Sequence, residues 1–419
     1  MVQRVLKKEL EKVSAGRAMK YIVFLGDGMA DYPLPELGDR TPLQVANKPT
    51  IDRIAKLGRS GIFITVTDDL PPGSEVANLS ILGYDPHRYY QGRGVIEAAS
   101  LGVALEPDDL ALRCNLICIK DGRIKNHSAG HITTEEAALL IEEVNRQLAN
   151  ERVRFYPGFT YRHLCVVKNG SSEIECFPPH DYVGEKALDL LPRAKTPSAE
   201  PTVQLLRQLT LSSWEILTGQ AVNLNRTLQG KDPANSLWFW SPGKKPKMPT
   251  FQERYGLKGA VISAVDLIKG LGVYAGFDVI QVPGATGLID TNYEGKADAC
   301  LEALFDHDLV YLHLEAPDEA GHSRNLREKV RAIELFDSRL VARVMAGLEE
   351  KRVLATVAVL SDHLTPVSRG NHVHGPVPVA IYNPNLPPDA VDRFDERSAQ
   401  NGALGELRGD GFIKLLLGQ

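Results

Sequence analysis

Tyr21-Ile-Val-Phe-Leu-Gly-Asp27 decides the fold, because a continuous apolar run ends there in an acid. Such a run, without polar alternation, is typical of a strand buried on both faces of a parallel sheet. Two later stretches share this form: Leu309-Val-Tyr-Leu-His-Leu-Glu-Ala-Pro-Asp-Glu-Ala-Gly-His322 and Val353-Leu-Ala-Thr-Val-Ala-Val-Leu-Ser-Asp-His363. If the three are neighbouring strands, their acids and histidines gather at one carboxyl edge, where open α/β sheets bind ligands.

The pattern of elements predicts a core interrupted by an insertion. Residues 47–58 have Pro49 near a helix start and end in Gly58, and an apolar strand follows, so the chain opens as a βαβ unit. Between residues 100 and 255 short strands, Gly/Pro/Asn turns and one long helix predict an α+β domain. We therefore predict an α/β core from residues 19–99 and 256–419, preceded by a charged extension, residues 1–18.

The composition restricts the classes of function. The 419 residues are 43% hydrophobic and 24% charged, as in ordinary globular proteins, and a net charge of -5 gives no field that attracts nucleic acid or an anionic membrane. The five cysteines contain no C-x-x-C pair, which favours reduced thiols in a cytoplasmic protein. No apolar run approaches the roughly 18 residues of a membrane span, and the N-terminus lacks the apolar stretch of a signal peptide. The number of subunits cannot be predicted.

The acids and histidines at the strand ends suit a divalent metal site. Asp318 and His322 are four residues apart, so one helical turn puts both on the same face, with oxygen and nitrogen ligands for Mn²⁺ or Zn²⁺. The alternative is a helix-capping acid beside an unrelated surface histidine. His372 and His374 follow closely after the third strand and add imidazoles, one of which can be an ordinary loop residue. The five strand-end ligands are Asp27, Asp318, His322, Asp362 and His363.

Ser74, in Pro71-Pro-Gly-Ser-Glu-Val-Ala-Asn-Leu79, is the candidate nucleophile. Two metals a few ångströms apart can clamp a transferring phosphoryl group, and a metal-bound serine hydroxyl has a lowered pKa. Gly73 allows a tight turn before a helix whose N-terminus favours an anion. The alternative is that Ser74 only caps this helix.

A phosphorylated or carboxylate substrate also needs cations. Arg93, His131, Arg162 and Lys258 are the predicted substrate-binding residues, and Arg93 and Arg162 are favoured because arginine binds such groups in a bidentate way. Further candidates are Arg113, Lys244 and Lys245, and each of these seven residues can instead be a plain surface charge.

In nearly its whole length from Tyr21 onward the chain resembles the cofactor-independent phosphoglycerate mutases of the archaeal type, in the alkaline phosphatase superfamily. The matching motifs, in the family's order, are Gly26-Asp-Gly28, Leu37-Gly-Asp-Arg-Thr-Pro-Leu43, Pro71–Leu79, Leu82-Gly-Tyr-Asp-Pro86, Tyr90-Gln-Gly-Arg-Gly94, Val282-Pro-Gly-Ala-Thr-Gly287, Asp318–His322, Ser361-Asp-His363 and His372-Val-His-Gly-Pro-Val-Pro-Val379. The resemblance implies an alkaline-phosphatase-like core with a mostly parallel sheet flanked by helices, plus an inserted substrate-binding domain.

The resemblance also implies two metal ions and a phosphoserine route. One ion would be held by Asp27, Ser74, Asp362 and His363, and the other by Asp318, His322 and His372. His372 stands four residues before the Pro-Val-Pro element, where the family has its ligand, and His374 does not. Manganese is the favoured metal, with zinc, cobalt or magnesium as alternatives. Ser74 would take phosphate from 3-phosphoglycerate and return it to the 2-hydroxyl of glycerate, a reaction of glycolysis and gluconeogenesis.

Two other activities remain open from the sequence. A bacterial subgroup of the family, named as a proposed homoserine kinase, shares Ser-Ala-Gly-His-Ile-Thr-Thr-Glu-Glu and Arg-Cys-Asn-Leu, and residues 113–136 resemble that subgroup more closely. Transfer of phosphate to homoserine or another hydroxyl is therefore one alternative, although the chain has no G-x-x-x-x-G-K-[ST] loop for ATP. A metal-dependent phosphatase is the other. The expected partner in the main interpretation is a small phosphorylated carboxylate.

Overall fold

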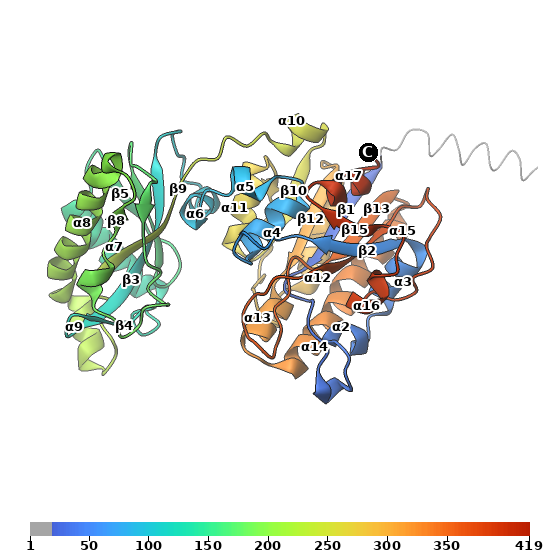
Figure 1. Cartoon of the computed structure of the whole chain (residues 1–419), viewed down its shortest axis with the longest axis horizontal. Coiled ribbons are helices and arrows are strands. Elements are labelled where there is room, and N and C mark those ends of the chain that lie inside the picture. The colour runs from blue at the N-terminus through green and yellow to red at the C-terminus, as the bar shows by residue number, and fades with distance from the viewer. Residues whose placement is uncertain (1–18) are drawn as a thin grey trace, which may run out of the picture. The chain divides into compact units, whose positions relative to one another are not determined.

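The computed structural model describes residues 19–419, so the predicted extension 1–18 lies outside the described residues. The described chain divides into two compact units, a core unit (residues up to Tyr90 together with Met248–Gln419) and an inserted unit (Gln91–Lys247). The core is therefore assembled from two separate stretches of sequence. Figure 1 shows the elements of both units.

An eight-stranded sheet forms the centre of the core unit, in the order β11-β10-β12-β1-β13-β14-β2-β15. Only β14 runs antiparallel to its neighbours among the described strands, so the sheet is mostly parallel, as predicted. Its strands are β1 (Lys20–Gly26), β2 (Arg59–Ile64), β10 (Gly259–Ile262), β11 (Asp278–Val279), β12 (Leu309–Leu314), β13 (Ala355–Leu360), β14 (Val377–Tyr382) and β15 (Gly405–Arg408).

Helices cover this sheet, and the larger apolar core lies on one of its faces. Alternate strand residues such as Ile22, Phe24, Val310 and Leu312 pack there against the helices α3, α12, α14 and α15. The helices of the core unit are α2 (Pro42–Val45), α3 (Pro49–Leu57), α4 (Ser74–Ile81), α5 (Pro86–Tyr89), α10 (Phe251–Tyr255), α11 (Asp266–Tyr274), α12 (Tyr293–Ala303), α13 (Ala316–His322), α14 (Leu326–Leu335), α15 (Ala342–Lys351), α16 (Glu396–Ala399) and α17 (Gly411–Leu417), with a short 3-10 helix η1 (Pro35–Leu37) and a π-helical segment η4 (Phe336–Val341) between α14 and α15.

The inserted unit is built on an antiparallel sheet in which the long strand β3 pairs with β4, β6 and β9. Its apolar core lies between this sheet and helices α7 and α8. The long helix predicted for this stretch is confirmed as α7, which begins after a capping box formed by Thr133 and Glu136. The elements are α6 (Arg93–Ser100), β3 (Leu110–Lys120), β4 (Arg123–Asn126), α7 (Thr134–Leu148), β5 (Val153–Tyr156), β6 (Arg162–Val167), β7 (Ile174–Glu175), β8 (Arg193–Ala194), α8 (Glu200–Thr218), α9 (Ala221–Leu228) and β9 (Ser236–Lys244), with short turns η2 (Ala187–Leu190) and η3 (Pro197–Ala199).

The limits of the inserted unit, 91 and 247, differ from the predicted limits of 100 and 255. Helix α6 belongs to the inserted unit. Gly94, which has no Cβ, lets this helix lie directly against the backbone of β3 and of Ser241. Helix α10 belongs to the core unit, where the ring of Phe251 lies 5.2 Å from that of Phe277. Over the described residues, no helix has the length and apolar character required to cross a bilayer.

Candidate metal and phosphoryl-transfer site

Three strand ends meet at one edge of the core sheet, as the sequence predicted. Strand β1 pairs in parallel with β12 on one side and β13 on the other. Asp27 follows β1, helix α13 follows β12, and Asp362 and His363 follow β13. The acids and histidines of three distant segments therefore share the carboxyl edge.

The first group, here called the serine cluster, consists of Asp27, Ser74, Asp362 and His363. His363 Nε2 lies 3.0 Å from the Oγ of Ser74, 3.3 Å from Asp27 Oδ1 and 3.4 Å from Asp362 Oδ2. All four side chains are buried, and Asp27 Oδ1 has no hydrogen-bond partner within residues 19–419. An unpartnered carboxylate oxygen inside such a cluster fits a metal ligand, because a buried polar atom left unpaired is costly.

Backbone donors fix the orientation of Asp362. Its Oδ1 accepts hydrogen bonds from the amides of Gly28 (3.0 Å) and His363 (2.9 Å), which leaves Oδ2 directed at the cluster. Gly28 has a φ of 56°, in the left-handed region, and a Cβ on it would collide with the side chain of Asp318. The Gly26-Asp-Gly28 turn is thus required for the close approach of β1 to both other strand ends.

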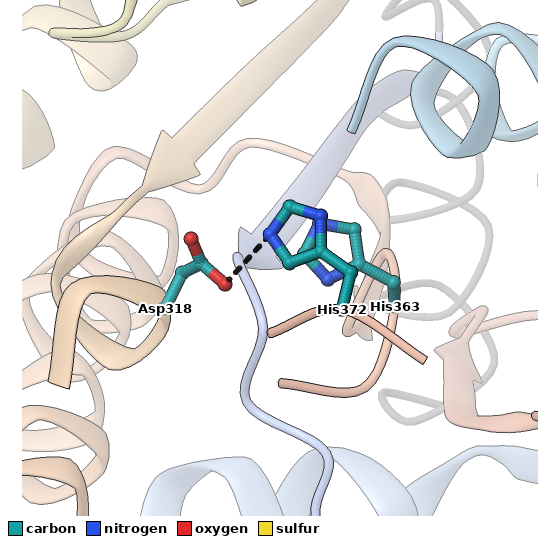
Figure 2. Close-up of side chains that lie close together, drawn as sticks. All are labelled: Asp318, His363 and His372. Atoms are coloured by element: carbon teal, nitrogen blue, oxygen red, sulfur yellow. Dashed lines mark ion pairs between the residues drawn. The ribbon is translucent and has the colours of Figure 1, made fainter. Parts of the chain in front are cut away.

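The second group, here called the histidine cluster, consists of Asp318, His322 and His372. Helix α13 places Asp318 and His322 one turn apart, with His322 Nε2 3.1 Å from Asp318 Oδ2. His372 comes from the loop before β14, and its Nε2 lies 3.5 Å from Asp318 Oδ1 (Figure 2) and 3.0 Å from His322 Nε2. Two imidazole nitrogens and a carboxylate that face one another suit Mn²⁺ or Zn²⁺.

The two clusters are contiguous. The rings of His363 and His372 lie with centroids 3.9 Å apart (Figure 2). The Thr365 hydroxyl donates to Asp318 and lies 3.2 Å from His363 Nδ1, so it joins a residue of each cluster. Potential ligand atoms of Asp318, His363 and His372, and likewise those of Asp27, Asp362 and His363, lie within 4.8 Å of one another. This arrangement has the outline of a two-metal site.

The electrostatics of the clusters are dominated by burial and crowding of charge. Burial and the neighbouring carboxylates of Asp362 and Glu315 raise the pKa of Asp27 well above its usual value. Burial acts in the same direction on Asp318, but hydrogen bonds to His322 and His372 hold its pKa well below its usual value. The hydrogen bond to Asp318 raises the pKa of His322 to about 9. A divalent cation would relieve the repulsion among the carboxylates and would displace the proton on His322.

A third group, Asp27, His313 and Glu315, also brings ligand atoms within 4.8 Å of one another. Two of its members already form a hydrogen bond with each other, because His313 Nε2 lies 2.8 Å from Asp27 Oδ2. The buried ammonium of Lys296 acts electrostatically on Glu315 and donates to the His313 carbonyl. A cation is therefore already present beside this group.

A buried ion pair ties together the loops that carry the ligands. Lys329, on α14, is fully buried and its Nζ lies 2.8 Å from Asp31 Oδ2. The same ammonium donates to the carbonyls of Ala30 (3.3 Å) and Thr365 (2.8 Å). Ala30 follows Asp27 and Thr365 follows His363, so one side chain holds both loops.

The predicted substrate-binding residues are divided between the two units. Arg93, at the start of α6, His131 and Arg162, at the start of β6, all belong to the inserted unit. Lys258 lies elsewhere, at the amino-terminal end of β10, where its Nζ is 3.1 Å from Asp278. That end of a parallel strand is opposite to the edge that carries Asp27, so the structure does not bring Lys258 to the clusters.

Arg93 and Arg162 belong to a group of cationic side chains whose other members could not all be predicted from the sequence. Burial lowers the pKa of Arg113, and the charges of Arg93 and Arg162 lower it further. Two histidines belong to the same group. Burial lowers the pKa of both His127 and His180, and the nearby charges of His131 and Arg113, respectively, lower these pKa values further. The guanidinium of Arg113 lies 4.3 Å from the ring centroid of Trp240, and the ring of His180 lies 5.3 Å from that ring.

His372 and His374 have different surroundings, which gives a direct test of ligand identity. His374 Nε2 hydrogen-bonds to the Leu70 carbonyl at 2.8 Å, whereas His372 faces Asp318. We expect His372→Gln to weaken one of two bound metal equivalents by more than the ~10–100-fold typical of losing a supporting hydrogen bond. His374→Gln should change neither equivalent by more than a few-fold. Titration calorimetry with Mn²⁺ measures both, and equal losses in the two variants would contradict the assignment.

Comparison with known proteins gives a consistent result. Residues 55–223 match the family model for 2,3-bisphosphoglycerate-independent phosphoglycerate mutase. A protein of that name from Methanosarcina acetivorans is 52% identical over 401 residues, which cover 95% of this chain and 100% of the relative. Among solved structures, a Pyrococcus horikoshii protein is 30% identical with a TM-score of 0.82, covering 96% of this chain and 98% of the other. A cofactor-independent phosphoglycerate mutase from Thermoplasma acidophilum is 29% identical with a TM-score of 0.69, covering 96% and 99%.

Proposed function

Since the chain belongs to the family of 2,3-bisphosphoglycerate-independent phosphoglycerate mutases, we propose that it interconverts 3-phosphoglycerate and 2-phosphoglycerate. The observation that supports this most is the position of the Ser74 hydroxyl, 3.0 Å from His363 Nε2 inside the serine cluster. The hydroxyl stands at the first residue of α4, where a helix N-terminus favours an anion. A buried serine hydroxyl beside the serine and histidine clusters suits phosphoryl transfer.

The proposed reaction passes through a phosphoserine. The Ser74 Oγ forms a bond to phosphorus as the bond from phosphorus to the 3-oxygen of the substrate breaks. Glycerate then turns, its 2-oxygen forms a bond to the same phosphorus, and the bond to Ser74 breaks. The proton lost by the attacking hydroxyl in each step balances the proton gained by the leaving oxygen. When bound, the divalent ions would lower the pKa of the attacking hydroxyl and neutralise the phosphoryl oxygens.

The residues divide into two proposed ligand sets, with manganese as the favoured metal. Asp27, Ser74, Asp362 and His363 would hold one ion, since Asp27 Oδ1 is buried and unpartnered and Asp362 is pinned through its other oxygen. Asp318, His322 and His372 would hold the second, because their ligand atoms lie within 3.5 Å in successive pairs.

We assign the carboxylate of the substrate to cations of the inserted unit. Arg93 and Arg162 are the main candidates, because the charges of both lower the pKa of the buried Arg113, which places the three arginines in one cationic group. His131 is added because it lowers the pKa of His127, a histidine of the same group. An arginine binds a carboxylate in a bidentate way. Lys258 is not included, because Asp278 pairs with it at the other edge of the sheet. The partner is thus a small phosphorylated carboxylate, and the five cysteines, none of them in a disulfide, favour a cytoplasmic setting.

The test uses the full chain loaded with Mn²⁺ and given 3-phosphoglycerate. We expect ³¹P spectra to show 2-phosphoglycerate without release of inorganic phosphate, because a mutase retains the phosphoryl group. A parallel sample receives ATP and homoserine. Turnover only in the parallel sample would favour the kinase alternative, and steady release of phosphate would favour a phosphatase. Either of these results contradicts the proposal.

A further inference from the structure

Strand β12 presents two different faces to the molecule. Val310, Leu312 and Leu314 belong to the large apolar core on one side of the sheet. The alternate residues Tyr311 and His313 share the opposite face, because side chains alternate along a strand. Both are buried, with exposed fractions of 2% and 0%. A buried phenol and a buried imidazole next to each other on one strand require polar partners.

His313 has its partner in Asp27. Its Nε2 lies 2.8 Å from Asp27 Oδ2, and its Nδ1 lies 3.1 Å from the Ser263 Oγ. With the ring proton on Nε2, His313 donates to Asp27 Oδ2, and its Nδ1 can accept from the Ser263 hydroxyl, so both ring nitrogens have a partner. His313 thus occupies Oδ2 of Asp27 and leaves Oδ1 for the serine cluster.

Tyr311 acts on Asp362 through one intermediate residue. Its hydroxyl donates to Asn78 Oδ1 at 2.5 Å. The Nδ2 of Asn78 donates to Asp362 Oδ2 at 3.1 Å and to the Ser74 carbonyl at 2.8 Å. If the Asn78 amide turned over, its oxygen would face the Asp362 carboxylate and the Ser74 carbonyl, two acceptors. The phenol therefore determines which side of the amide faces the serine cluster.

We propose that Tyr311 and His313 are positioning residues, which hold the two carboxylates of the serine cluster in the orientation that binds metal. One works through Asn78 on Asp362 and the other works directly on Asp27. Because both groups donate from a fully buried face of one strand, the two carboxylates stay aligned against their mutual repulsion before a cation arrives. The inference rests on the metal site of the proposed function and is independent of the substrate's identity.

The test is metal affinity in Tyr311→Phe, which removes one oxygen atom and keeps the ring. Mn²⁺ is titrated calorimetrically into the full chain after treatment with a chelator. We expect two equivalents in the unsubstituted protein. In the variant we expect one equivalent to weaken by ~10–100-fold, the range for loss of a supporting hydrogen bond, while the other is unchanged. A purely structural role would not weaken one site selectively.

Tyr293→Phe is the matched control. Tyr293 is equally buried, and its hydroxyl donates to the Ile289 carbonyl at 3.0 Å, away from both clusters. The control should lose a comparable amount of stability and keep both metal equivalents at full affinity. A second pair keeps the test valid if Tyr311→Phe folds poorly: His313→Leu should weaken the same equivalent, and His313→Gln, which restores a donor, should recover most of the affinity.

Two results would overturn the inference, and each is separable from failure of the proposed function. Full affinity at both sites in Tyr311→Phe, or an equal loss in Tyr293→Phe, would show that the phenol does not position a ligand. If the unsubstituted protein binds no metal, the proposed function fails first, and this inference fails with it.

Discussion

Ser74→Ala is expected to abolish turnover of 3-phosphoglycerate, with a loss on the order of 10⁴-fold or more, because Ser74 is the phosphoryl acceptor of the proposed reaction. The fold should be retained, since the Ser74 side chain does not cap α4. The histidine cluster does not include Ser74, so it should keep its metal equivalent, while the serine cluster binds more weakly. Coupled spectrophotometric detection of 2-phosphoglycerate measures turnover, and calorimetry measures the metal.

Ser80→Ala supplies the control on the same helix. Ser80 is also buried, and its hydroxyl donates only to the backbone carbonyl of Val76 at 3.3 Å. We expect its turnover to stay within a few-fold of the unsubstituted protein. Substantial turnover in Ser74→Ala would exclude the phosphoserine route, because the proposed reaction has no other covalent intermediate.

Lys329→Met is expected to lower the free energy of unfolding by about 3–5 kcal/mol, because it leaves the buried carboxylate of Asp31 without its cation. Asp31 accepts from the amides of Tyr32 (2.8 Å) and Val367 (3.1 Å), which hold it in place but do not neutralise it. Urea denaturation followed by circular dichroism measures the change. Tryptophan fluorescence is unsuitable, because all three tryptophans belong to the inserted unit.

The control for this prediction is Arg331→Met, on the same helix. Arg331 is largely exposed and pairs with Glu334 at 3.5 Å, so its loss should cost less than ~1 kcal/mol. The double variant Lys329→Met with Asp31→Asn should recover part of the stability, since no charge is then buried. If Lys329→Met alone were as stable as Arg331→Met, the ion pair would not hold the two loops.

The sheet and the ligand edge could be predicted because few alternatives fit the sequence. Short, continuous apolar runs such as 21–25 and 355–360, rich in β-branched residues, favour strands covered on both faces, and an acid that follows such a strand lies at the carboxyl edge of the sheet. The spacing of Asp318 and His322 fixed one helical turn, which α13 confirms. These inferences need only local geometry and the parallel rule.

Inferences that depended on direction or distant partners were less successful. Lys258 directly precedes strand β10, so the edge of the sheet at which it lies depends on the direction of that strand. The lysine itself does not indicate this direction. The antiparallel direction of β14 could not be predicted from Val377–Tyr382, which is apolar throughout and unusual only in Pro378. Tyr311 and His313 were hidden inside an apolar run, although their period of two was a signal that could have been used.

The order of the strands has a consequence for how the molecule is made. Among the described strands, β1 pairs with β12 and β13, and β2 pairs with β14 and β15, all of which are translated more than 200 residues later. The described strands of the inserted unit pair with one another, and this unit has been translated by residue 247. At roughly 5–20 residues per second, β1 waits about 15–70 seconds for its neighbours on the ribosome. We expect the inserted unit to fold first, while residues 19–90, with Asp27 and Ser74, remain available to chaperones until the last third of the chain emerges.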